Sequence, residues 1–269
     1  MSQKPTIVLV PGAWHIAATW NKVTSLLEAQ QYKCISVTLP STTGSPDTTF
    51  LDDINAARDA IVGETSQSRD VVVVVHSYGS MVGVSASKGL TGKKAQQDTT
   101  TPSSVEVSQS DQPNSGHVIG FIMIATGFVR TGVTFFGGFD GPPPPIWNAN
   151  YETGFLEITI DPRELFYHDL PKEEGDYWVS KLTKQALKPL TEGGEHAYSA
   201  WMDAPIWFLA TVEDRGLPFE FQKLLVQGAK DAGADVTMRE IVTSHSPMLS
   251  RPEETVEFMQ DALAYFARK

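Results

Sequence analysis

Short hydrophobic runs alternate along the chain with amphipathic segments of helical length. The strongest run is residues 71–75, five consecutive valines. Because this run is apolar on both faces, it predicts a central parallel strand covered by helices on each side. Weaker runs predict further strands at residues 7–10, 34–39, 119–124, 206–209 and 236–242.

Between these runs, apolar side chains recur at helical spacing. This spacing predicts helices at residues 20–29, 50–62, 219–232 and 253–267, together with a small-residue helix after residue 79. Strands that alternate with helices of about 10 to 15 residues are typical of a parallel sheet with right-handed crossovers. The expected fold class is therefore α/β, with a mostly parallel sheet and helices on both faces.

Two segments interrupt the alternation. Residues 89–117 are rich in Thr, Ser, Gln, Gly and Lys, which predicts a flexible surface loop. Residues 127–200 contain a proline run, several aromatic residues and short helical patterns, which predicts an inserted helical cap. We therefore expect a core in two parts, residues 1–126 and 201–269, with the cap (lid) at 127–200.

Composition narrows the possible partners. The 269 residues carry a formal net charge of −11 without a long basic run, which argues against binding nucleic acid. No apolar run approaches the roughly 20 residues that span a bilayer, and the N-terminus lacks a signal pattern. We expect no membrane association and a cytoplasmic location, and a homodimer stays open. The single cysteine, Cys34, is interpreted as a core residue.

A candidate nucleophile follows the strongest strand. Ser77 stands in Val75-His76-Ser77-Tyr78-Gly79, directly before a predicted helix. The usual nucleophile elbow is G-x-S-x-G, on a strained turn that exposes the Ser Oγ above the sheet. Val75 replaces the first glycine, so the strand–turn–helix context carries the interpretation. The alternative is an ordinary serine in a turn.

Two backbone N–H groups are candidates for stabilising an oxyanion. The Tyr78 N–H lies where the predicted helix begins and would face a negative charge that develops at Ser77. The loop after the first strand offers the Ala13 N–H, and Gly12 lets the backbone approach closely. The alternative for this loop is a plain strand-to-helix turn.

A general base and an acid are expected at the same edge of the sheet. His245 follows the last predicted strand, so it lies at the carboxyl edge with Ser77. Asp214 follows the 206–209 strand and would orient the imidazole, with adjacent Glu213 as the alternative. The chain order Ser77, Asp214, His245 is typical of α/β-hydrolases.

These motifs resemble a known superfamily. The chain is similar to α/β-hydrolases, in particular the plant methylesterase and hydroxynitrile lyase group and related small fungal and bacterial hydrolases. The resemblance is carried by Val8–Trp14, His76–Gly79, Glu213–Pro218 and Ser244–Pro247. It implies an α/β-hydrolase fold and the catalytic triad of Ser77, Asp214 and His245. Pro11 and Val75 stand where many relatives have His and Gly, which leaves the substrate class open.

The remaining expectations concern the substrate. Large aromatic residues in the cap favour a small, fairly apolar substrate, and we expect Trp14, His15, Phe136 and Trp147 to contact it. The sequence has no nucleotide-binding glycine motif or metal-ligand cluster, so neither cofactor nor metal is expected. The predicted activity is serine hydrolysis of an ester or lactone. The alternatives are C–C bond hydrolysis, lyase or cyclase chemistry, and a ligand receptor.

Overall fold

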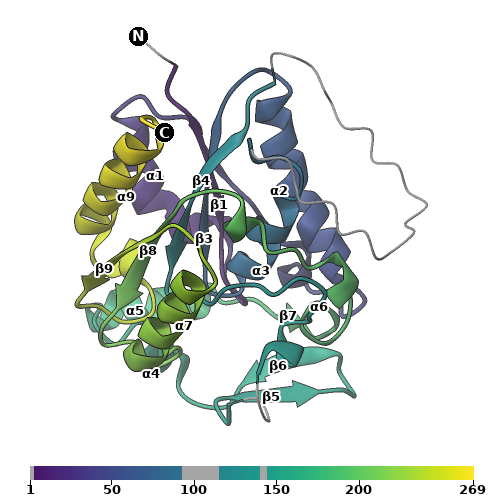
Figure 1. The fold of residues 1–269 in the computed structure, drawn as a ribbon. Helices are drawn as coiled ribbons and strands as arrows, with labels where there is room; N and C mark the ends of the chain where they lie inside the picture. Colours follow the sequence, from purple (N-terminus) through teal and green to yellow (C-terminus); the bar gives the residue numbers. More distant parts are fainter. Residues whose placement is uncertain (1–2, 93–114, 140–143) are drawn as a thin grey trace.

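A six-stranded sheet forms the centre of the protein (Figure 1). The computed structural model describes residues 3–92, 115–139 and 144–269. The strand order of the six-stranded sheet is β2-β1-β3-β4-β8-β9, and every neighbouring pair is parallel. The strands are β1 (Thr6–Val10), β2 (Cys34–Ser36), β3 (Val71–His76), β4 (Val118–Ile124), β8 (Ile206–Thr211) and β9 (Val236–Ile241). The predicted parallel α/β sheet is thus confirmed.

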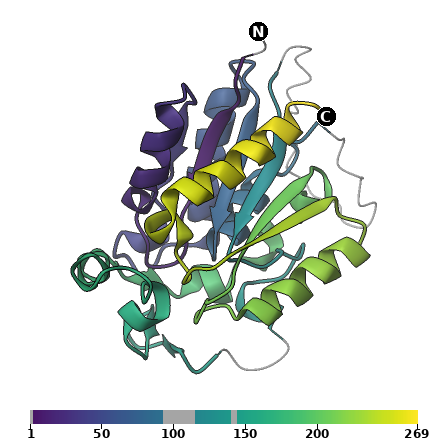
Figure 2. The same ribbon diagram turned by 90° about the vertical axis from the view of Figure 1, so that its left-hand side faces the viewer.

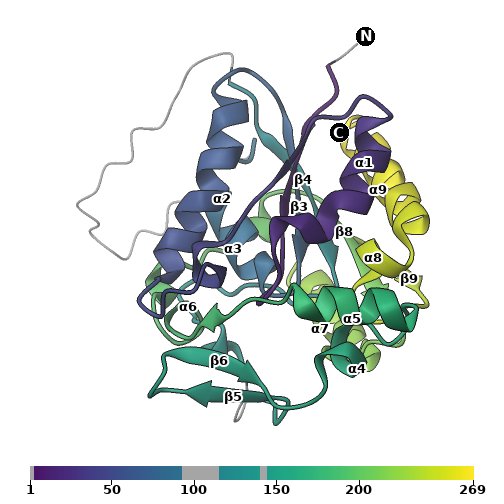
Figure 3. The same cartoon turned by 180° about the vertical axis from the view of Figure 1, so that it is seen from behind.

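Helices cover both faces of this sheet. On one face α1 and α9 pack against each other, and on the opposite face α2 packs against α3 (Figure 3). α7 packs against β8 and β9. The bounds are α1 (Asn21–Glu28), α2 (Phe50–Thr65), α3 (Gly79–Ala86), α7 (Phe219–Asp231), α8 (Pro247–Ser250) and α9 (Pro252–Phe266), with 3-10 turns at Ala17–Trp20 and Pro40–Thr42. Helices on both faces explain why the central strands can be apolar throughout.

A central strand and an edge strand of the sheet differ in burial. All five valines of β3 are fully buried, and the strand pairs with β1 and β4. β2 is an edge strand and ends at Ser36, three residues earlier than predicted. With a partner on one side only, β2 leaves Cys34 half-buried. The interpretation of Cys34 as a core residue was therefore wrong, because its side chain is not fully buried. Burial raises the pKa of this thiol to about 12, which keeps it protonated.

Residues 127–200 are here called the inserted segment, and its described residues, 127–139 and 144–200, lie beyond the carboxyl ends of the parallel strands (Figures 1 and 2). The sequence predicted a helical cap for this segment, and this prediction was wrong in part. The segment contains a three-stranded antiparallel sheet, which helical periodicity missed because each strand has only two to four residues. Its elements are β5 (Trp147–Asn150), β6 (Phe155–Ile158), β7 (Gln185–Ala186), α4 (Pro162–Phe166), α5 (Lys172–Ser180), α6 (Lys188–Thr191) and 3-10 turns at Phe136–Gly138, Gly194–His196 and Ala200–Met202.

Most of the predicted flexible loop at residues 89–117 lies outside the described residues, which exclude 93–114, so this loop stays a prediction. Both ends are hydrogen-bonded to the core. The Leu90 carbonyl accepts from the Val118 N–H at 2.8 Å, and the Gly116 N–H donates to the Thr65 carbonyl at 2.9 Å. Among the described residues, no helix is long and apolar enough to cross a membrane.

Candidate active site

Ser77 occupies a strained turn at the end of β3. Its φ is +51°, in the left-handed region that side chains other than glycine rarely adopt. Within 71–86 it is also the one half-buried residue, and all the others are buried. A strained, accessible serine between a buried strand and a buried helix is the geometry of a nucleophile elbow.

The loop after β1 approaches this elbow so closely that a side chain has no room at Gly79 and little room at Gly12. A Cβ on Gly79 would lie 2.5 Å from the Pro11 carbonyl oxygen, and one on Gly12 would lie 3.0 Å from the Ser77 Cβ. The loop therefore lies directly against the elbow, with Ala13 next to Gly12. Among the described residues, the Ala13 and Tyr78 N–H groups have no hydrogen-bond acceptor, so both are free to donate to a ligand.

Asp214 lies against His245 in a buried hydrogen bond. The His245 Nδ1 and the Asp214 Oδ2 are 2.7 Å apart, and the two residues are 4% and 7% exposed. The other carboxylate oxygen of Asp214 accepts the Gly216 and Leu217 N–H groups, each at 2.8 Å. Because Nδ1 donates to a carboxylate, Nε2 is left as the acceptor that a general base needs.

Two polar side chains beneath this pair hold the carboxylate further. The Thr211 hydroxyl donates to Asp214 Oδ2 at 2.7 Å, and the fully buried Gln222 amide donates to the same oxygen at 3.3 Å. Glu213, the alternative acid, is exposed, and its carbonyl oxygen is bonded to His168 Nε2 at 2.9 Å. The structure therefore places Asp214, and not Glu213, beside His245.

His76 joins the His245 loop to the elbow. Its Nε2 donates to the His245 carbonyl at 2.9 Å, and the two rings have centroids 4.7 Å apart. Burial and the neighbouring histidines hold the pKa of His76 well below its ordinary value, so the ring stays neutral. Since His76 directly precedes Ser77, this contact brings His245 next to the elbow. The sequence offered no signal for it beyond adjacency to Ser77.

A second buried contact, which the sequence did not indicate, lies under the elbow. The Tyr78 hydroxyl donates to Asp53 of α2 at 2.9 Å, and the Ser41 N–H donates to the same carboxylate at 2.8 Å. Burial raises the pKa of Asp53 to about 6, although the hydrogen bonds from Ser41 and Tyr78 act to lower it. Asp53 is fully buried and Tyr78 is 2% exposed, so this pair ties α2 to the start of α3.

The comparisons with known proteins agree with this geometry. The Alpha/beta hydrolase family matches residues 7–258 of the chain. The chain belongs to the alpha/beta hydrolase family. It is 28% identical to Alpha/beta hydrolase nvfD of Aspergillus novofumigatus over 264 residues, covering 96% of each sequence.

Solved hydrolase structures share the fold. A pyrethroid hydrolase from Sphingobium faniae has a TM-score of 0.69 at 18% identity, with 98% of this chain and 99% of that chain covered. The methylesterase MES16 from Arabidopsis has a TM-score of 0.68 at 18% identity, with 97% and 99% covered. These structures confirm the predicted α/β-hydrolase fold. The family match identifies the protein as a hydrolase.

Three of the four residues expected to contact the substrate of this hydrolase lie in one aromatic cluster. Phe136 stacks on Trp147 with centroids 6.5 Å apart, and Trp147 lies 6.3 Å from Trp14. Phe135 joins the cluster to Tyr78, with ring centroids 5.9 Å apart. The rings therefore extend between Trp14 and Tyr78, the neighbours of Ala13 and Ser77.

His15, the fourth expected contact, is used internally. Its Nδ1 donates to the Ala13 carbonyl at 2.6 Å, and its Nε2 accepts from the Tyr167 hydroxyl at 2.8 Å. Burial lowers the pKa of His15 to about 4, so the imidazole is neutral, as this pair of bonds requires. With both ring nitrogens engaged, His15 has no polar atom left for a ligand.

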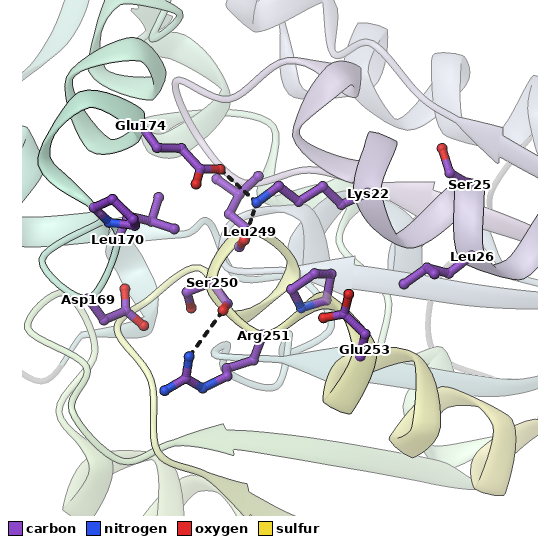
Figure 4. A pocket seen from close by; sticks show the side chains of 12 residues that line it. Lys22, Ser25, Leu26, Asp169, Leu170, Glu174, Leu249, Ser250, Arg251 and Glu253 are labelled. Carbon is purple, nitrogen blue, oxygen red and sulfur yellow. Dashed lines mark hydrogen bonds and ion pairs between the residues drawn. The ribbon is translucent and has the colours of Figure 1, made fainter.

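Two hollows on this hydrolase lie away from the candidate catalytic residues. The larger, about 780 Å³, follows the seam between α1, α8 and the inserted segment (Figure 4). Lys22 bridges it by contacting Glu174 at 2.6 Å and the Leu249 carbonyl at 2.8 Å. The smaller, about 360 Å³, is lined by Trp14 and by residues of the inserted segment. Ser77, Asp214 and His245 line neither hollow.

Proposed function

We propose that this hydrolase cleaves a carboxylic ester or lactone of a small, fairly apolar substrate, with Ser77 as nucleophile, His245 as general base and Asp214 as the orienting acid. The observation that carries the proposal is the buried Asp214–His245 hydrogen bond, tied through His76 to a strained, accessible Ser77. This combination is what a serine needs in order to act as a nucleophile near neutral pH.

The proposed reaction passes through an acyl-enzyme. The Ser77 Oγ attacks the substrate carbonyl carbon while its proton moves to the His245 Nε2, and Asp214 stabilises the imidazolium. The carbonyl oxygen becomes an oxyanion that the Ala13 and Tyr78 N–H groups bind. When the tetrahedral intermediate collapses, His245 gives the proton to the departing alcohol oxygen. Water then attacks the acyl group with the same base and releases the acid.

The surroundings support a neutral, apolar substrate. The aromatic cluster of Trp14, Phe135, Phe136 and Trp147 offers rings and no charge. Apolar walls with few polar groups favour ligands of the same character. Two structural neighbours are named a pyrethroid hydrolase and a methylesterase, which agrees with ester hydrolysis as the reaction class. We further propose that the inserted segment acts as a cap that closes over such a substrate.

A lysine placed over the nucleophile would support lyase chemistry. The lysines of the inserted segment have other partners, which favours hydrolysis. Each has another partner: Lys172 pairs with Asp176, Lys188 pairs with Asp47 at 2.9 Å, and the Nζ of Lys184 lies over the Phe155 ring, 4.8 Å from its centroid. Lys181 lies over Tyr177 at 5.1 Å in the same way.

An activity-based probe tests the proposal. We expect a fluorophosphonate to label the wild-type protein on Ser77 and to leave Ser77→Ala unlabelled, with both proteins equally folded by circular dichroism. A panel of aryl esters and lactones then gives the substrate class. Equal labelling of both proteins, or no labelling and no turnover from folded wild-type protein, would reject Ser77 as the nucleophile.

A further inference from the structure

Trp14 has an unusual backbone for a bulky side chain. Its φ is +60°, a left-handed conformation that is unfavourable in residues other than glycine and persists only where the surroundings enforce it. The strained residue directly follows Ala13, the proposed oxyanion donor. The Ala13 N–H belongs to the preceding peptide unit, so whatever enforces the Trp14 conformation also restrains the residue that carries this donor.

The inserted segment supplies that enforcement at three atoms of Trp14. The backbone carbonyl accepts from the Thr183 N–H at 2.9 Å and from the Thr183 hydroxyl at 3.0 Å. The backbone N–H donates to the Gln185 side chain at 3.4 Å, and the indole Nε1 donates to the Leu156 carbonyl at 2.9 Å. Backbone and side chain are thus both fixed to the inserted segment.

Two of these partners form one pair in the antiparallel sheet of the inserted segment. Leu156 of β6 lies opposite Gln185 of β7, so the pairing of the strands places both acceptors together. Gln185 is fully buried, and its amide nitrogen donates to the Ala186 carbonyl at 3.1 Å, which turns its oxygen toward Trp14. The pairing of β6 and β7 therefore holds the two acceptors side by side.

A second contact reaches the peptide unit between Ala13 and Trp14 from its carbonyl side. The Tyr167 hydroxyl of the inserted segment donates to His15 Nε2, and His15 Nδ1 donates to the Ala13 carbonyl at 2.6 Å. The peptide units on both sides of residue 14 therefore depend on the inserted segment.

We propose that the inserted segment positions the loop after β1, here called the oxyanion loop. Trp14 and Gln185 are the positioning residues that direct the Ala13 N–H toward the reacting carbonyl. The inference rests on the proposed function, since it assigns the origin of one oxyanion donor. Donors act on the transition state only when they are held in place beforehand, so a small displacement of Ala13 lowers the rate of the chemical step without weakening substrate binding.

The test compares two Trp→Phe variants that differ in one hydrogen bond. Trp14→Phe keeps a ring but removes the indole N–H that binds the Leu156 carbonyl. Trp207→Phe is the matched control, because Trp207 is buried to a similar extent, 7% against 6% exposed, and its indole N–H has no hydrogen-bond partner in the described part of the chain. We expect Trp14→Phe to lower kcat about tenfold with KM within about twofold, and Trp207→Phe to change neither.

A tetrahedral inhibitor separates positioning from substrate contact. A trifluoromethyl ketone bound to Ser77 carries an oxyanion, so its affinity should fall with kcat in Trp14→Phe. An increase in KM at unchanged kcat would mean that Trp14 only contacts substrate, and equal effects of both variants would mean a purely structural role. Either result overturns the proposal.

Hydrogen–deuterium exchange decides the inference even without turnover. We expect the amides of residues 11–16 to exchange faster in Trp14→Phe than in wild type or Trp207→Phe, because the loop loses a restraint. Equal exchange in all three proteins would show that the inserted segment does not hold the loop. If wild type neither turns over esters nor reacts with the fluorophosphonate, the proposed function fails while the exchange result still stands.

Discussion

The Asp214 carboxylate is the most firmly held side chain of the candidate site. Its two oxygens accept from Gly216, Leu217, Thr211 and His245 at 2.7–2.8 Å. Position in the sequence was enough to predict His245 and a carboxylate from Asp214 or Glu213 at this site, because each follows a predicted strand whose carboxyl end must lie at the edge of the sheet that carries Ser77. It could not choose between Asp214 and its neighbour on physical grounds, because both follow the same strand.

The two carboxylates give a first prediction. Asp214→Asn should lower kcat about 10²–10⁴-fold, because the amide cannot orient and stabilise His245 as the carboxylate does. Glu213→Gln should stay near wild type, since Glu213 is exposed. Steady-state kinetics on one aryl ester measure both. The opposite ranking would mean that Glu213 is the acid.

Nothing in the sequence indicated the role of Asp53, because its partners Tyr78 and Ser41 come from other elements and no local pattern connects them. Its titration predicts a pH dependence of stability. The pKa of Asp53 is raised to about 6 from 3.8 by burial. The folded state therefore binds the proton more tightly than the unfolded state, and stability falls as pH rises from about 4 to about 6.

The variant Asp53→Asn removes this titration. We expect the free energy of unfolding of wild type, relative to that of Asp53→Asn, to decrease by about 1–3 kcal/mol between pH 4 and pH 7. Urea denaturation at four pH values measures it, with Asp59→Asn, an exposed carboxylate of the same helix, as the control. A difference that stays constant or increases with pH would contradict the raised pKa.

At the scale of elements, the site depends on how closely α3 approaches the end of β1. Gly79 begins α3, and a Cβ there would meet the carbonyl oxygens of Pro11 and Val10 at 2.5 and 2.6 Å. The sequence predicted a helix after the elbow and a close backbone approach at Gly12. It missed β5, β6 and β7, because strands of two to four residues are too short to show an alternating pattern.

Two Gly→Ala substitutions test this contact. Gly79→Ala should lower both activity and the free energy of unfolding, because the oxyanion loop must move away from α3. Gly63→Ala in α2 meets no atom within 4 Å and should stabilise the protein by up to about 1 kcal/mol, since alanine favours the helix. Thermal unfolding and ester kinetics measure both. If Gly79→Ala behaves like Gly63→Ala, α3 does not need the close approach.

At the scale of the whole molecule, the order of the strands brings the site together. The segments after β1, β3, β8 and β9 all leave the same edge of the parallel sheet, and they carry Ala13, Ser77, Asp214 and His245. This convergence could be predicted from sequence, because alternating strands and helices allow few other topologies. The contacts of the inserted segment with Trp14 and His15 could not, since they join residues more than 140 positions apart.

The measurement that tests the central claim most directly is the intact mass of the protein during turnover of a short-chain aryl ester. If Ser77 is the nucleophile, wild type should gain the mass of the acyl group, peptide mapping should place it on Ser77, and acid should be released steadily. Ser77→Ala, equally folded, should show neither the adduct nor the release. Steady hydrolysis by Ser77→Ala, or no adduct and no acid from wild type across a broad panel of esters and lactones, would contradict the account.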